Sequence, residues 1–229
     1  MAVRALAFDL FGTLVDWRSG IACAFRSAGT PGDPEELADA WRERYVPIML
    51  EVNAGQRPWG NFDELHYATL DELLIERGLS VSDEDRHRLV HAWHRLEPWP
   101  DVRSGLGRLR GRLITTALSN GHTALLVDLA RHGDVRFDCL LSAELAHAYK
   151  PAREVYLTAA RLLCLDPSEL MMVAAHPGDL KAARRAGLRS AFIQRQLEYG
   201  PDSPAREDPD ADQSVHDLEQ LAERLEAPA

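Results

Sequence analysis

An aspartate closes the first apolar run of this chain, and a turn that contains a hydroxyl group follows it. Asp9 comes directly after residues 3–8, which are mostly apolar, and Gly12 and Thr13 come soon afterwards. A carboxylate at the tip of a buried strand, beside backbone amides and a hydroxyl group, suits a nucleophile. On this segment alone, an aspartate that only caps the following turn is the alternative interpretation.

Two further polar groups follow later in the chain. Ser119 and Asn120 come after the apolar residues 113–118, where a hydroxyl and an amide could face an oxyanion, although this is also an ordinary turn sequence. Lys150 lies in a polar connection, and the chain has only one other lysine, Lys181. At ~4 Å and an effective dielectric constant of ~20, an ammonium attracts a carboxylate by about 4 kcal/mol, enough to keep a partly buried aspartate ionised. A lysine that faces solvent is the alternative.

A fourth polar group follows the apolar residues 171–175. His176 and Asp179 place an imidazole and a carboxylate at a predicted strand end. Asp179 could activate a water molecule or hold a metal ion, and it could equally cap the helix expected from residue 180.

The elements that must position these groups are short strands alternating with helices. Strands are expected at residues 3–8, 113–119, 139–142, 171–175, 191–193 and 213–215, and helices at 123–132, 154–163 and 180–186. This alternation predicts an α/β fold, a Rossmann-like, doubly wound parallel sheet with helices on both faces. Because ligands bind beyond the carboxyl ends of parallel strands, the four polar groups should meet at one edge.

Residues 17–97 show a different pattern. They have helical periodicity at 34–52, 61–77 and 82–96 and no convincing strand, and the sequence Pro98-Trp99-Pro100 marks their downstream end. We therefore expect a discontinuous core domain of residues 1–16 and 98–229 with an inserted helical cap at 17–97. A solvated loop at 199–212 should precede a last helix near 217–225.

Composition limits the partners of the chain. With 26 basic and 36 acidic residues among 229, the net charge is −10, which disfavours nucleic acid. No apolar stretch approaches the ~18–20 residues of a membrane span, and we expect a cytoplasmic protein. Cys23, Cys139 and Cys164 form no C-x-x-C pair, so they are expected to be reduced thiols in a core, without a metal.

Taken in order, the four polar groups resemble the sites of the haloacid dehalogenase superfamily, across nearly the whole chain. Phosphatases of that superfamily carry a second aspartate two positions after the nucleophile, where this chain has Phe11, and they supply clustered acids for magnesium, where it has Asp179 alone. Residues 8–17 and 173–180 instead resemble the 2-haloacid dehalogenase branch, whose halide leaving group needs no proton.

The resemblance also assigns residues that the pattern alone leaves open. It implies that Arg42, in the cap, receives the halide or orients the substrate anion, and that Tyr156 belongs to the site; an interface arginine and a core tyrosine are the alternatives. The branch's best-known members place Ser and Asn where this chain has Ala174 and His176. His176 could orient or deprotonate the hydrolytic water, or simply lie in the strand-to-loop junction. The tryptophans 17, 59, 93 and 99 could furnish an apolar pocket for the halogen-bearing carbon, but packing between cap and core is the expected role of most of them.

The expected reaction is hydrolysis of a short 2-haloalkanoic acid to the 2-hydroxy acid through an aspartyl ester, without a cofactor or metal. Asp9 is the expected nucleophile and Thr13 its support. Lys150 keeps Asp9 and Asp179 charged together, and Asp179, with His176, aids the water.

The substrate carboxylate is expected to bind Ser119, Asn120 and the backbone near Leu10, and the resemblance suggests a homodimer. Expected partners are the anionic substrate and halide only. Two alternatives remain at this stage: a phosphatase acting on a small phosphoester, and a non-catalytic member that binds a partner through its cap.

Overall fold

The computed structural model describes residues 2–226 and contains a six-stranded parallel sheet in the order β3-β2-β1-β4-β5-β6. The strands are β1 (Ala5–Phe8), β2 (Ile114–Ser119), β3 (Cys139–Ser142), β4 (Leu170–Ala174), β5 (Arg189–Ile193) and β6 (Gln213–Val215). All four residues of β1 are buried, as expected for a central strand with both faces covered. The predicted doubly wound sheet is confirmed.

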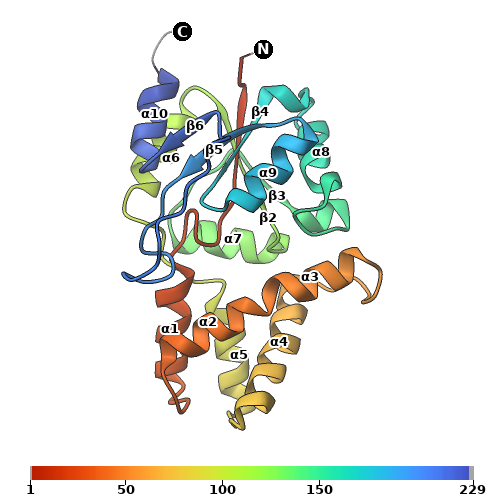
Figure 1. Ribbon diagram of the computed structural model, residues 1–229, viewed down its shortest axis with the longest axis vertical. Coiled ribbons are helices and arrows are strands. Elements are labelled where there is room, and N and C mark those ends of the chain that lie inside the picture. The colour runs from red at the N-terminus through yellow and green to blue at the C-terminus, as the bar shows by residue number, and fades with distance from the viewer. Residues whose placement is uncertain (1, 227–229) are drawn as a thin grey trace.

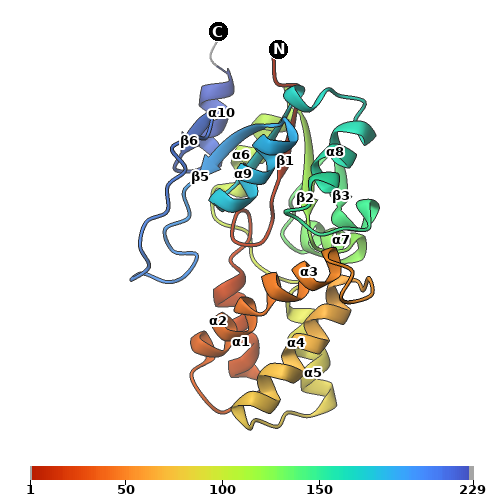
Figure 2. The same ribbon diagram turned by 45° about the vertical axis from the view of Figure 1, so that its right-hand side comes forward.

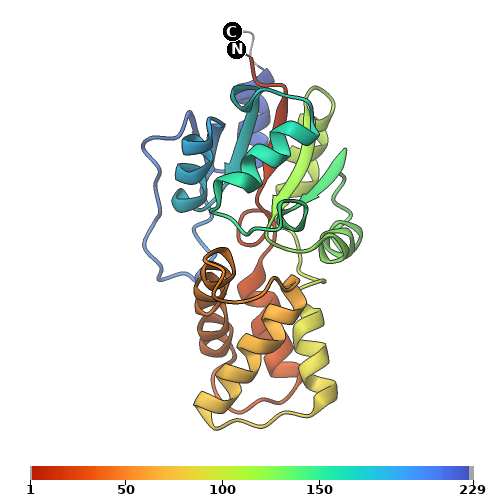
Figure 3. The ribbon, with the colours of Figure 1, turned by 90° about the vertical axis from the view of Figure 1, so that its right-hand side faces the viewer.

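Helices cover both faces of this sheet. They are α6 (Val102–Arg110), α7 (Thr123–His132), α8 (Arg153–Leu162), α9 (Pro177–Ala186) and α10 (Leu218–Glu226), with short 3₁₀ turns at Ala143–Ala146 and Pro167–Glu169. Helices α8 and α9 pack together in front of the sheet in Figure 3, and α10 lies behind it against α6. The α6–α10 contact requires Gly105, because a Cβ there would lie 2.8 Å from the backbone of Leu218.

Five helices between residues 17 and 92 form a separate group, which we call the helical layer. They are α1 (Trp17–Ser27), α2 (Pro34–Glu43), α3 (Tyr45–Asn53), α4 (Phe62–Arg77) and α5 (Asp83–Ala92). Figure 1 and Figure 2 show this layer beyond the carboxyl ends of the strands, on the opposite side of the molecule from both termini. The carboxyl edge of the sheet therefore faces the helical layer. The core and cap boundaries at 17 and 97 stay a prediction.

Two expectations about the helices were wrong. The single helix expected at 34–52 is interrupted at Arg44, because Pro47 cannot donate the hydrogen bond that a continuous helix requires and its ring opposes the carbonyl four residues earlier. By restarting at Tyr45, α3 places Pro47 in its first turn, where the N–H has no helical partner in any case. Helix α5 ends at Ala92, so the helix expected to reach residue 96 is shorter.

The expected core location of the cysteines was also wrong. All three are free, but Cys23 and Cys164 are exposed and Cys139 is half-buried. Cys23 lies on the outer face of α1, and Cys164 sits just after α8 in the left-handed region, with φ of 54°. Within residues 2–226, no helix combines the length and apolar character needed to cross a bilayer.

Candidate active site

The register of the central strands brings the polar groups together. Phe8, the last residue of β1, pairs with Ala117 of β2 and with Val173 of β4. The segments that follow these strands consequently leave the sheet side by side. Asp9, Asn120 and His176 all line one cavity of about 640 Å³ between the sheet edge and the helical layer.

Three side chains donate hydrogen bonds to the buried Asp9 carboxylate. Lys150 Nζ lies 2.8 Å from Oδ1, while Thr13 Oγ1 lies 2.8 Å and His176 Nδ1 3.1 Å from Oδ2. Burial alone would raise the pKa of Asp9, but Lys150 and His176 outweigh it and hold that pKa well below its ordinary value. Thr13 is fixed in turn by the Ala175 N–H, at 2.9 Å. Asp9 is thus an ionised, oriented carboxylate that faces the cavity.

Lys150 joins Asp9 to Asp179. Its ammonium lies 2.6 Å from Asp179 Oδ2, and the other oxygen of Asp179 accepts a hydrogen bond from Tyr156 Oη at 2.5 Å. Burial would lower the pKa of Lys150, but Asp179 and Asp9 raise it above its ordinary value, and burial together with Asp179 raises that of Tyr156. The two carboxylates therefore share one cation in a largely buried site.

Arg42 brings a cation from the helical layer to the same cavity. Its guanidinium carbon lies 3.9 Å from the centre of the Tyr45 ring and 5.4 Å from that of Trp17. Nε and Nη1 are buried and find no hydrogen-bond acceptor among the described residues. Because a buried guanidinium without acceptors is costly, these donors fit a bound anion.

A family model of haloacid dehalogenase-like hydrolases matches residues 3–187 of the chain. The chain belongs to this family. The resemblance inferred from the sequence motifs is therefore confirmed.

Relatives in this family are dehalogenases. (S)-2-haloacid dehalogenase 1 of Pseudomonas sp. (strain CBS-3) is 32% identical over 196 residues, which cover 84% of this chain and 85% of that protein. Haloacetate dehalogenase H-2 of Moraxella sp. (strain B) is 28% identical over 197 residues, covering 84% and 86% of the two chains.

Solved structures of two dehalogenases resemble this chain over nearly its full length. The L-2-haloacid dehalogenase PA0810 has a TM-score of 0.91 and 46% identity, with 99% of this chain and 100% of that chain covered. The defluorinating L-2-haloacid dehalogenase Rha0230 has a TM-score of 0.92 and 39% identity, with 98% and 96% covered.

Glu198 is a member of the site that the sequence analysis missed. Its buried carboxylate lies 2.8 Å from His176 Nε2 and accepts a hydrogen bond from Trp17 Nε1 at 3.1 Å. Glycine is required at position 12, where φ is +84° and a Cβ would overlap the Glu198 carboxylate. One signal for Glu198 was available, because it follows the carboxyl end of β5 at the same edge of the sheet.

The remaining predicted residues contribute in different ways. Asn120 lines the cavity, and its Oδ1 accepts a hydrogen bond from the Lys150 N–H at 2.7 Å. Ser119 is buried outside the cavity, and its Oγ accepts from the Gly121 N–H at 3.2 Å. The Leu10 N–H has no acceptor within residues 2–226. The structure thus brings the Asn120 side chain, but not that of Ser119, to the cavity.

Of the four tryptophans considered for a pocket, Trp17 lines the cavity. Trp59 instead stacks on Tyr149 at 4.6 Å between ring centres, and Trp99 Nε1 donates to the Gly12 carbonyl at 2.9 Å. Trp93 packs behind the cavity against Phe11 and Trp41, at 5.6 Å from each ring.

Replacing Glu198 by Gln should move the alkaline limit of activity to lower pH. Burial would lower the pKa of His176, but Glu198 and Asp9 raise it to about 9. While His176 is protonated, three positive charges, on His176, Lys150 and Arg42, balance the carboxylates of Asp9, Asp179 and Glu198. Above that pH the site gains a net negative charge and repels an anionic substrate. Without the Glu198 charge the pKa of His176 falls, so kcat/KM should decline from a lower pH.

The measurement is a pH profile of kcat/KM for halide release by both proteins. Glu207→Gln is the matched control, because Glu207 is an exposed acid in the same loop. An alkaline limb at the same pH in Glu198→Gln and the parent protein would contradict the assigned role of the pair.

Proposed function

We propose that this protein hydrolyses short 2-haloalkanoic acids to 2-hydroxy acids through an ester on Asp9, without a metal ion. The observation that carries this proposal is the Asp9 carboxylate, held ionised by Lys150 and His176 and oriented by Thr13, at the wall of a cavity that also contains the Arg42 guanidinium with its two unpaired donors. The names of the curated relatives and similar solved structures support the same reaction class.

The first step is a displacement at carbon. A carboxylate oxygen of Asp9 attacks the carbon that bears the halogen, from the side opposite the halogen, so that a C–O bond forms as the carbon–halogen bond breaks. The halide leaves with the bonding electron pair and needs no proton. Arg42 receives either this halide or the substrate carboxylate, while Asn120 and the Leu10 N–H provide donors on the sheet side.

The second step is hydrolysis at the Asp9 carbonyl carbon. Water attacks this carbon, the bond to the substrate oxygen breaks, and the 2-hydroxy acid departs as the Asp9 carboxylate re-forms. Esterification has removed the Asp9 charge, one of the two charges that raise the pKa of His176, so His176 gives up its proton more easily in the intermediate. That proton goes to solvent, and the neutral Nδ1 then takes one proton from the attacking water and passes it to the departing substrate oxygen, which leaves as the hydroxyl of the 2-hydroxy acid. The other proton of the water, left on the re-formed Asp9 carboxyl, returns to His176. Asp179, which binds the same Lys150 ammonium as Asp9, helps to orient the water.

A phosphatase fits this site less well. Phe11, at the position of the general acid in related phosphatases, is buried and stacks on Phe62 with ring centres 5.4 Å apart, so no proton donor stands there. The Lys150 ammonium lies between Asp9 and Asp179, where these carboxylates would otherwise converge on a cation.

A screen for halide release tests the proposal. Its substrates are fluoroacetate, chloroacetate, bromoacetate and both enantiomers of 2-chloropropionate, each with and without chelator. We expect release that is insensitive to chelator, with the (S) enantiomer preferred, as the names of the relatives suggest. Hydrolysis of phosphoesters on addition of Mg²⁺, with no halide released, would favour the phosphatase. A thermal shift with chloroacetate but no turnover would favour a binding protein.

Arg42→Gln should lower kcat/KM for haloacids about 10²-fold, because removing one partner of a buried charge contact costs about 2–5 kcal/mol. Arg44→Gln is the control, since Arg44 binds Glu76 and the Ala40 carbonyl and does not line the cavity. Steady-state kinetics on chloroacetate make the comparison. Equal losses in both variants would indicate damage to the helical layer instead of a lost anion contact.

Other parts of the proposal are a cytoplasmic location, which suits three unpaired cysteines, and a homodimer with no nucleic-acid or membrane partner. Sedimentation of the purified protein decides the oligomeric state.

A further inference from the structure

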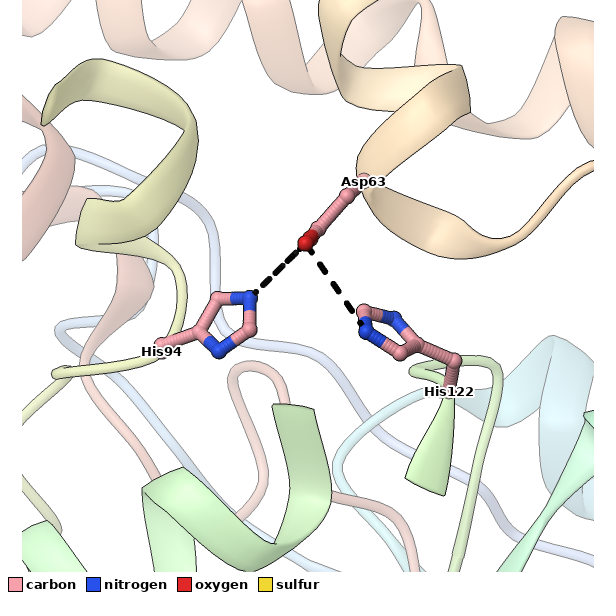
Figure 4. A group of neighbouring side chains, drawn as sticks. All are labelled: Asp63, His94 and His122. Carbon is pink, nitrogen blue, oxygen red and sulfur yellow. Dashed lines mark hydrogen bonds and ion pairs between the residues drawn. The ribbon is translucent and has the colours of Figure 1, made fainter. Parts of the chain in front are cut away.

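A cluster of two imidazoles and one carboxylate lies outside the catalytic cavity. Asp63 is at the start of α4, His94 follows α5, and His122 precedes α7, so the cluster joins the helical layer to the sheet (Figure 4). One donor atom from each residue lies within 4.8 Å of the others. His94 Nε2 is 3.0 Å from Asp63 Oδ1, and His122 Nε2 is 3.8 Å from Asp63 Oδ2.

The donor set suits a transition ion. Two imidazole nitrogens and a carboxylate oxygen are ligands of Zn²⁺, which leaves a fourth position for water, whereas Mg²⁺ and Ca²⁺ prefer oxygen alone. Donors around a tetrahedral ion stand about 3.3 Å apart, so a rotation of the His122 side chain would complete the set.

A second carboxylate orients one of the imidazoles. Asp128 Oδ2 lies 2.8 Å from His94 Nδ1, on the side of the ring away from Asp63. Such a carboxylate–histidine pair fixes the tautomer that presents Nε2 to a metal ion and raises the basicity of that nitrogen. The side chain of His94 is only 6% exposed, so this arrangement is built into the fold.

His122 packs edge-on against the ring of His94 but lacks hydrogen bonds that would explain its position without an ion. Its distance of 3.8 Å from Asp63 is too long for a hydrogen bond, and its Nδ1 is buried with no partner among residues 2–226. The His122 side chain is 12% exposed and makes no hydrogen bond within the described residues, so facing Asp63 alone contributes little stabilisation.

We propose that Asp63, His94 and His122 bind a divalent transition ion of the Zn²⁺ type, which clamps the helical layer to the loop after β2. On binding, the ion replaces the proton between His94 Nε2 and Asp63, and that proton leaves to solvent. None of the three residues lines the catalytic cavity. The ion therefore stabilises the observed contact between the helical layer and the sheet and takes no part in the reaction, so this inference does not rest on the proposed function.

The test is calorimetric titration with Zn²⁺ together with thermal unfolding. Because Cys23 and Cys164 are exposed thiols that could bind zinc, all proteins carry Cys23→Ser and Cys164→Ser. We expect one ion per chain and a melting temperature that rises with Zn²⁺ but not with Mg²⁺. His122→Gln should weaken Zn²⁺ binding at least ~10-fold and remove the thermal shift, because it deletes a ligand.

The matched control is His216→Gln, since His216 is an exposed histidine that lies outside the cluster and binds Gln194. It should bind Zn²⁺ as the parent does. If His122→Gln unfolds, Asp128→Asn provides the second test and should weaken binding about 10–100-fold. Absence of binding by the parent protein, or equal binding by parent and His122→Gln, would overturn the proposal.

Discussion

Asp9→Asn is expected to abolish halide release, with a loss of at least ~10⁴-fold in kcat, because a neutral amide cannot replace the carboxylate nucleophile that Lys150, Thr13 and His176 hold at the cavity wall. The neutral amide keeps the size of the side chain and can still bind Thr13, so the fold should survive. The rate of chloride or bromide release, followed until the parent has formed many equivalents of product per enzyme, measures the loss of activity. Folding is checked by far-ultraviolet circular dichroism.

Asp39→Asn is the matched control, because Asp39 lines the same cavity but binds Arg18, with two contacts of 2.8 Å. It should stay within a few-fold of the parent. In ¹⁸O water, the Asp9-containing peptide of the parent should gain ¹⁸O during repeated turnovers, since water attacks the carbonyl carbon of Asp9. An unlabelled peptide after many turnovers, or full activity in Asp9→Asn, would contradict the ester mechanism.

The strand-end groups were predictable because local patterns and one topological rule were sufficient. An apolar run followed by a polar turn places Asp9 and His176 at strand ends, and parallel strands align those ends. Lys150 and Asp179 then come within reach of Asp9 without any knowledge of the helical layer. The strands themselves were found within one or two residues of their observed bounds because buried parallel strands are continuous apolar runs.

The role of Glu198 and the surroundings of Arg42 could not be predicted, because they depend on tertiary contacts that no local sequence pattern encodes. Glu198 lies in an irregular segment after β5, and its approach to His176 depends on the missing Cβ of Gly12, far away in the sequence. The same amphipathic pattern around Arg42 would fit a surface helix, and only the docking of the helical layer turns its guanidinium toward the cavity. Helices α1 and α6 were missed because the glycines at positions 20, 105 and 107 weaken their helical signal.

Lys150→Met is expected to destabilise the protein by about 3–5 kcal/mol near neutral pH, because it leaves the buried carboxylates of Asp9 and Asp179 without their shared cation. We also expect activity to fall at least ~10³-fold. Loss of the positive charge raises the pKa of Asp9, so the nucleophile is ionised in a smaller fraction of molecules. Urea unfolding and halide release measure the two effects.

The pH dependence of unfolding distinguishes lost charge pairing from lost packing. In the parent, the folded-state pKa of Asp9 is depressed, so its contribution to stability is present above the unfolded pKa of about 3.9 and is lost as the pH falls toward the folded value. In Lys150→Met the folded-state pKa of Asp9 rises, because burial is then opposed by His176 alone, so protonation of Asp9 at acidic pH should recover part of the lost stability. Lys181→Met, which removes the exposed lysine, should change neither stability nor its pH dependence. If Lys150→Met lost the same free energy of unfolding at pH 5 and at pH 7.5, the Lys150 side chain would be stabilising the fold through packing alone. The proposal that Asp9 and Asp179 share its positive charge would then have to be abandoned.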